Sequence, residues 1–177
     1  GHLSRTLRQE GLVFQKRVEA LKVATFGDHQ GLSRALGEIA SHLGIDEFPC
    51  KMEEADHLIL LGDLEAPELG QADVTRILLL DDGVRITDAQ DRDGGVPSEL
   101  QEYGLCVIGA SLALQEVLRI QECMRQIDIV KAYVAVNYRI DTRDVGEGFL
   151  ADRDLQIKDR DGSSLPLFVK RREDGTE

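Results

Sequence analysis

The sequence predicts an α/β fold: a Rossmann-like, mostly parallel sheet flanked by helices, with a C-terminal antiparallel β appendage. Three apolar runs, at 22–26, 57–61 and 76–80, have the length and flanking turn signals of buried strands. Their near-continuous hydrophobicity is typical of strands covered on both faces, as in parallel sheets. Helical periodicity separates the first two runs and returns after the third. From about residue 131 the composition shifts toward β-forming residues.

The first half of the chain opens as a βαβ unit. A charged stretch at 3–19 is predicted to form a helix that packs on the domain, and the strand at 22–26 follows it. A helix is predicted over 32–43 and ends at Gly44. Its apolar side chains recur at helical spacing, and they are Leu32, Leu36, Ile39, Ala40 and Leu43. A strand followed at once by a helix is the usual start of such a unit.

The middle of the chain supplies the other strands. The runs at 57–61 and 76–80 are predicted to be the second and third strands. The Asp-Gly pair at 82–83 is a turn signal, so residues 84–87 are expected to pair back as a hairpin. Residues 88–98 are polar and glycine-rich and predict a surface loop.

A long helical pattern follows at 103–127 and predicts a helix over 104–125 that is packed on the sheet. Apolar residues dominate it, and a single polar stripe comprises Ser111, Gln115, Arg119, Glu122 and Gln126. A helix that is polar only along one stripe is mostly buried. Residues 132–140 are rich in Tyr and Val and predict a further strand.

A hairpin is predicted near the C-terminus. Apolar runs at 155–158 and 167–170 flank the Asp-Gly pair at 161–162. The chain therefore divides into a Rossmann-like core at 1–130 and a β-rich appendage of the same domain at 131–177.

Composition excludes several classes of function. The net charge of −12 repels phosphate backbones and disfavours nucleic-acid binding. No apolar run reaches the 18 residues of a membrane span, and no signal peptide is expected at the start. Three cysteines without close pairs argue against a disulfide scaffold or a structural zinc site, and they favour the cytoplasm.

The stretch 106–119 is the most specific part of the sequence. Small residues at Gly109, Ala110, Ser111 and Ala113 lead into the run Gln-Glu-Val-Leu-Arg at 115–119. This pattern resembles the late helix of the ubiquitin-activating-enzyme superfamily, which includes ThiF, MoeB and HesA. Close packing of a helix on a sheet explains the small residues. The resemblance extends in outline over 12–140 and implies a Rossmann fold, ATP and magnesium as cofactors, and a dimer or protein partner.

The nucleotide loop departs from the pattern of that family. The family carries Gly-x-Gly-x-x-Gly, whose glycines let backbone amides approach phosphates at a helix N-terminus. The corresponding candidates for cofactor binding here are Gly27, Asp28 and Gly31. Only Gly27 aligns with the motif, and Asp28 places a negative charge where a phosphate would lie. The alternative is a plain strand-to-helix turn in which Asp28 is the helix N-cap.

Acidic residues follow two of the predicted strands. Asp63, after the strand at 57–61, is the candidate for the catalytic and metal-binding aspartate that the resemblance implies. The alternative is a solvated loop residue. The pair Asp81 and Asp82 is interpreted as a turn, and the acids at 88–93 lack the spacing of a calcium loop.

Three functions remain open at this stage. The first is a divergent ThiF-like partner or scaffold subunit whose adenylation activity is reduced or lost. The second is an ATP-dependent enzyme that adenylates a carboxylate of a small molecule or a carrier protein. The third is an unrelated Rossmann protein that binds a nucleotide or S-adenosylmethionine.

Overall fold

A four-stranded mixed sheet forms the base of the molecule. The computed structural model describes residues 18–68, 70–80, 83–90 and 103–138, and the backbone of 157–158 and 164–165. The strands lie in the order β1-β2-β3-β4, with bounds Val23–Phe26, His57–Leu61, Asp73–Leu80 and Gly83–Thr87. The first three are parallel, and β4 pairs antiparallel with β3 as the predicted hairpin. The predicted α/β class with a mostly parallel sheet is confirmed.

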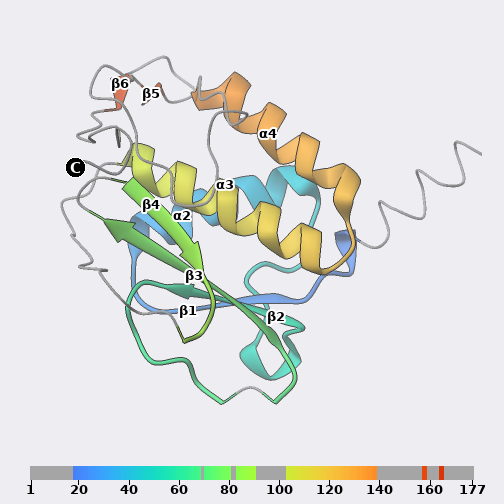
Figure 1. The fold of residues 1–177 in the computed structure, drawn as a ribbon. Coiled ribbons are helices and arrows are strands. Elements are labelled where there is room, and N and C mark those ends of the chain that lie inside the picture. The colour runs from blue at the N-terminus through green and yellow to red at the C-terminus, as the bar shows by residue number, and fades with distance from the viewer. Residues whose placement is uncertain are drawn as a thin grey trace, which may run out of the picture.

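Three long helices lie on one side of this sheet (Figure 1). They are α2 (Gln30–Leu43), α3 (Tyr103–Ile120) and α4 (Met124–Tyr138). Both α2 and α3 contribute to the core above the sheet, and α3 lies against β3 and β4. The last helix, α4, packs on α2 and α3 and forms an outer layer. None of the described helices is long and apolar enough to cross a membrane.

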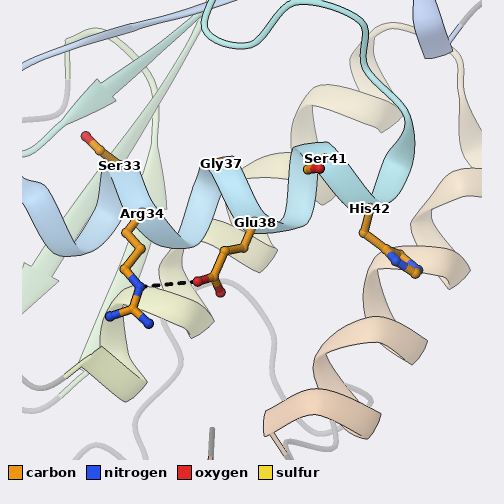
Figure 2. A pocket seen from close by; sticks show the side chains of 6 residues that line it. All are labelled: Ser33, Arg34, Gly37, Glu38, Ser41 and His42. Carbon is orange, nitrogen blue, oxygen red and sulfur yellow. Dashed lines mark hydrogen bonds and ion pairs between the residues drawn. The ribbon is translucent and has the colours of Figure 1, made fainter. Parts of the chain in front are cut away.

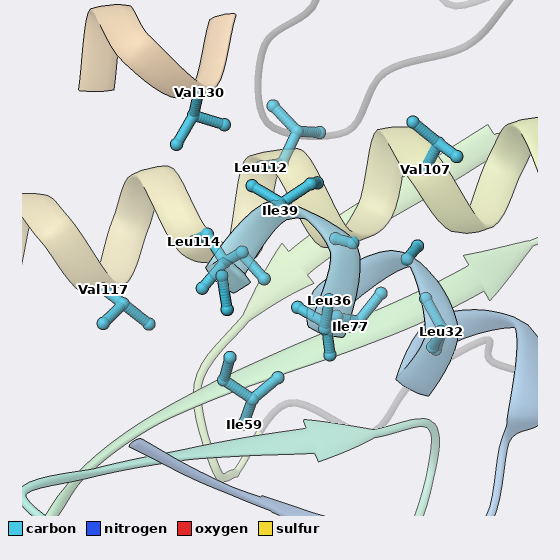
Figure 3. Close-up of a cluster of buried hydrophobic side chains, with 14 of the residues drawn as sticks. Leu32, Leu36, Ile39, Ile59, Ile77, Val107, Leu112, Leu114, Val117 and Val130 are labelled. Carbon is cyan, nitrogen blue, oxygen red and sulfur yellow. The ribbon is translucent and has the colours of Figure 1, made fainter. Parts of the chain in front are cut away.

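The main core lies between the sheet and the helices (Figure 3). All five apolar residues on which the helix at 32–43 was predicted are buried. They share one core cluster with Ile59 of β2 and Ile77 of β3. A second, smaller cluster of Ala24, Cys50, Leu58 and Leu60 lies on the opposite face of the sheet. Irregular chain carrying Met52, Ala55 and Ala66 packs against that cluster, and it includes the short 3-10 helix η1 (Met52–Glu54).

The small residues of α3 allow this helix to pack closely on the sheet. A Cβ added to Gly109 would lie 2.9 Å from Cγ2 of Ile77 in β3. Real Cβ atoms essentially never approach that closely, so a larger residue would push α3 away from the sheet. The expected close approach of this helix to the sheet is therefore confirmed.

Two predictions in the second half of the chain are wrong. The helix predicted over 104–125 ends at Ile120, and a turn with Glu122 at φ 60° separates it from α4. The strand predicted at 132–140 does not exist in the described part, because the chain is helical to Tyr138. Buried residues of α4 recur at helical spacing, and they are Gln126, Val130, Tyr133, Val134 and Tyr138. Packing of this face on α2 and α3 outweighs the β propensity of Tyr and Val.

The C-terminal hairpin is present in shifted form. Strands β5 (Ile157–Lys158) and β6 (Ser164–Leu165) pair antiparallel, one on either side of the Asp-Gly pair at 161–162, which itself lies outside the described residues. The predicted second strand at 167–170 lies outside the described residues, as does most of the helix predicted at 3–19, of which Val18 and Glu19 are helical.

Candidate functional site

The carboxyl ends of β1 and β2 form the candidate site. The two strands are parallel and in register, with Phe26 opposite Leu60, so both end at the same edge of the sheet. Gly27 and Gly62 follow them, and each has φ +121°, a conformation that favours glycine. A Cβ on Gly27 would lie 3.1 Å from the Cβ of Leu61. The sheet thus brings the turn that carries Gly27 beside the turn that carries Gly62.

His29, and not Asp28, caps the helix that follows β1. Helix α2 begins at Gln30, and the extended backbone of His29 makes this residue the N-cap. Its Nδ1 accepts a hydrogen bond from the amide of Leu32 at 3.1 Å. Nδ1 is therefore the unprotonated ring nitrogen. Asp28 is exposed one residue earlier, so the alternative prediction that Asp28 is the N-cap is wrong.

Gly31 lies in the first turn of α2 and faces α3. A Cβ at this position would lie 2.7 Å from Sγ of Cys106. Burial raises the pKa of the Cys106 thiol to about 12, so this sulfur is a neutral packing group at ordinary pH. The absence of a side chain at Gly31 is thus required by the contact between two helices.

A small cavity lies between these turns and β3. Its lining is His29, Leu32, Leu61, Gly62, Asp63, Ile77, Leu78 and Leu79. The volume is about 10 Å³, which is room for one water at most. Pockets that hold small-molecule ligands occupy roughly 300–1,000 Å³. As described, these residues do not fit a nucleotide.

The predicted site residues therefore meet only in part. Asp63 lies at the carboxyl end of β2 and borders the cavity, as expected. Gly27 lies in the adjacent turn, whereas Gly31 is turned toward α3. The pair Asp81 and Asp82 lies outside the described residues. Within the described ranges, no three His, Cys, Asp or Glu side chains gather in a way that could hold a metal ion.

A larger and open hollow lies along the outer side of α2, where sequence reasoning placed no site (Figure 2). It has a volume of about 710 Å³ and is lined by Ser33, Arg34, Gly37, Glu38, Ser41 and His42. Glu38 accepts a hydrogen bond from Nε of Arg34 at 3.2 Å and another from the hydroxyl of Tyr138. The ring of His42 stacks on Tyr133, with 4.4 Å between centroids. In the sequence, the signal that could have located this hollow is the four-residue spacing of the small residues Ser33, Gly37 and Ser41, which places them on one face of α2.

His57 is a buried polar residue at the amino-terminal end of β2, the end of the strand away from the candidate site. It is 0% exposed, and its Nε2 lies 2.6 Å from Oγ1 of Thr75 on β3. Burial lowers the pKa of the imidazole to about 4, although nearby Asp73 and Glu116 act in the opposite direction. The ring is therefore neutral at pH 7.

Comparisons with known proteins assign no family. No family model, no curated protein and no solved structure matches the chain. The basis for a function is therefore the residues themselves and the geometry of the strand-end site.

Proposed function

We propose that this chain is a protein-binding partner or scaffold subunit of the activating-enzyme type, with adenylation activity reduced or lost. One observation carries the proposal: the chain's own groups fill the place where such a fold would hold a nucleotide. His29 takes the amide of Leu32, and the cavity beside it has a volume of about 10 Å³. A phosphate at this helix N-terminus would need that amide and far more room.

The charges near the site support the same proposal. Adenylation brings a carboxylate to the α-phosphate, so the site must supply positive charge or a metal ion. Asp28 is exposed just before the N-cap of α2, and Asp63 borders the cavity. Two carboxylates at this edge oppose the approach of a bare triphosphate.

The outer face of α4 supports association with a protein. Exposed apolar side chains lie along it, with Ile129 40% and Val136 78% exposed. Ala132, also exposed, lies between them, and the spacing of three and four residues places all three on one face of the helix. Contiguous exposed apolar patches mark protein interfaces, and we infer that these three side chains belong to one. A protein partner or a second copy of the chain would cover it.

An ATP–pyrophosphate exchange assay tests the loss of adenylation. The purified chain, with magnesium and a panel of small carboxylates and carrier proteins, is expected to give no exchange above background. Exchange that Asp63→Ala abolishes would instead establish the adenylating enzyme, which the position of Asp63 at a parallel strand end favours. Asp56→Ala is the matched control, because Asp56 is exposed just before the other end of the same strand.

A thermal-shift panel tests the third possibility, that the chain is an unrelated Rossmann protein that binds a nucleotide or S-adenosylmethionine. ATP, NAD and S-adenosylmethionine are expected to leave the melting temperature unchanged. A ligand present at 100 times its dissociation constant would add about 2.7 kcal/mol of stability. Such a shift with one of these cofactors would contradict the proposal.

Analytical ultracentrifugation tests the association. If the chain pairs with itself through α4, Val136→Glu should lower the weight-average mass at a fixed concentration. Gln30→Glu, which adds the same charge at an exposed position on α2, should not. A monomer at every concentration, with no protein partner recovered from cells, would count against a partner subunit.

A further inference from the structure

Arg76 is a buried cation on the face of the sheet opposite the helices. It lies on β3, opposite Leu60 of β2 and Thr87 of β4. The residue is 0% exposed, and on the same face Leu60 belongs to the smaller apolar cluster, against which Val74 packs. A guanidinium stays charged at every ordinary pH, so its burial must be compensated by hydrogen bonds.

Backbone carbonyls from two separate segments supply those hydrogen bonds. Nη1 donates to the carbonyl oxygens of Gly62 and Leu64, at 2.8 and 2.6 Å. Nε donates to the carbonyl of Asp88 at 3.1 Å, and Nη2 donates to that of Ala89. The first segment, 62–64, follows β2 and borders the strand-end cavity. The second, 88–90, follows β4.

We propose that Arg76 couples these two segments, so that the loop at 62–64 opens over the strand-end cavity only when the segment at 88–90 also loosens. Displacing either segment alone leaves the buried guanidinium without half of these acceptors. When one segment leaves, water reaches the guanidinium and replaces the lost acceptors, so the bonds to the other segment lose the low-dielectric surroundings in which they are strong. The second segment is then held less tightly than in the closed state. A partner that draws residues 88–90 away from the sheet would therefore let the segment at 62–64 move away from the cavity at the carboxyl end of β2. The coupling does not depend on what the site binds.

The test loosens one segment and measures the other. Asp88 accepts a hydrogen bond from the amide of Gln90 at 2.9 Å, and Asp88→Gly removes this bond and frees the backbone. Nitrogen-15 relaxation on the full chain should then show lower order parameters at 62–64 as well as at 88–90. Rigid backbone has values of about 0.85 and flexible backbone falls below about 0.6. The exchange rate of the Arg76 Nε proton should rise about tenfold or more.

A second variant and a control make the result decisive. Lysine carries its donors on one nitrogen and cannot reach both segments, so Arg76→Lys should loosen 62–64 and 88–90 together. In that background Asp88→Gly should have no additional effect at 62–64, because the coupling is already lost. Asp56→Gly, at an exposed position away from this contact, should leave both segments as in the wild type. Loosening confined to 88–90 in Asp88→Gly would overturn the proposal.

Discussion

Gly31 of α2 and Cys106 of α3 meet so closely that a Cβ on the glycine would lie 2.7 Å from the sulfur. In most helices Gly→Ala stabilises by about 1 kcal/mol. Here we expect Gly31→Ala to lower the free energy of unfolding by about 1–3 kcal/mol, because the added methyl overpacks the core. Urea denaturation would measure the change.

Gly37, in the same helix, provides the matched control. A Cβ at that position would meet nothing within 4 Å, so Gly37→Ala should raise the stability by about 0.5–1 kcal/mol. Cys106→Ala in the Gly31→Ala background should recover part of the loss. Equal effects of the two alanines would show that the contact with Cys106 carries no strain.

The turn between α3 and α4 should tolerate a glycine better than its native residue. Glu122 has φ 60°, and Cys123 donates its amide to the carbonyl of Leu118 at 2.7 Å, as in a helix that ends in a left-handed residue. A side chain in that conformation costs roughly 1–2 kcal/mol. Glu122→Gly is therefore expected to raise the melting temperature, and Glu122→Ala should not. Calorimetry on both variants decides between these outcomes.

The cap on α2 should be replaceable by another capping side chain. Removing the acceptor with His29→Ala leaves the Leu32 amide without its 3.1 Å bond and should cost about 0.5–2 kcal/mol. Asparagine is a good N-cap, so His29→Asn should retain most of the stability. If both variants are equally destabilised, the histidine ring acts through something other than the cap.

The protein should lose stability as the pH is lowered, because His57 is buried in its neutral form. Burial lowers the pKa of His57 to about 4 in the folded protein, whereas the ordinary value of 6.5 applies in the unfolded chain. As the pH falls, the unfolded chain therefore takes up this proton at a higher pH than the folded protein does. The contribution of the neutral ring is complete above pH 6.5 and is lost as the pH falls toward 4, by about 3 kcal/mol in all. Denaturation of the wild type and of His57→Gln across this range should show a slope due to His57 only in the wild type. Parallel curves would contradict the assignment.

Most of the parallel sheet could be predicted because its signals are local. The strand at 57–61 is an unbroken apolar run, and Gly44 ends α2 with its amide bonded to the carbonyls of Ala40 and Ser41. The break after α3 could not be predicted, because Glu122 takes a conformation that sequence patterns assign to glycine. The second half of α4 was mistaken for a strand at 132–140 because its Val and Tyr residues favour β structure, and only tertiary packing decides against them.

The candidate site was predictable in position but not in content. Strand ends are where open α/β sheets bind ligands, and Asp63 was placed there correctly. Gly31 leaves room for the sulfur of Cys106, and this role depends on how closely α2 and α3 approach each other. No spacing in the sequence reveals that approach. The cap by His29 was missed because Asp28, one residue earlier, is the more usual capping residue.

The irregular chain that covers the back of the sheet has a consequence for how the sequence can change in length. Connectors on a protein surface usually accept insertions. Between α2 and β2, however, Cys50 donates its amide to the carbonyl of Val23 at 2.9 Å, and Asp56 donates to that of Lys22 at 2.8 Å. One added residue between these anchors would carry Cys50 off the apolar cluster or detach Asp56 from the edge of β1. Related chains should therefore vary in length elsewhere and keep the number of residues between these two points.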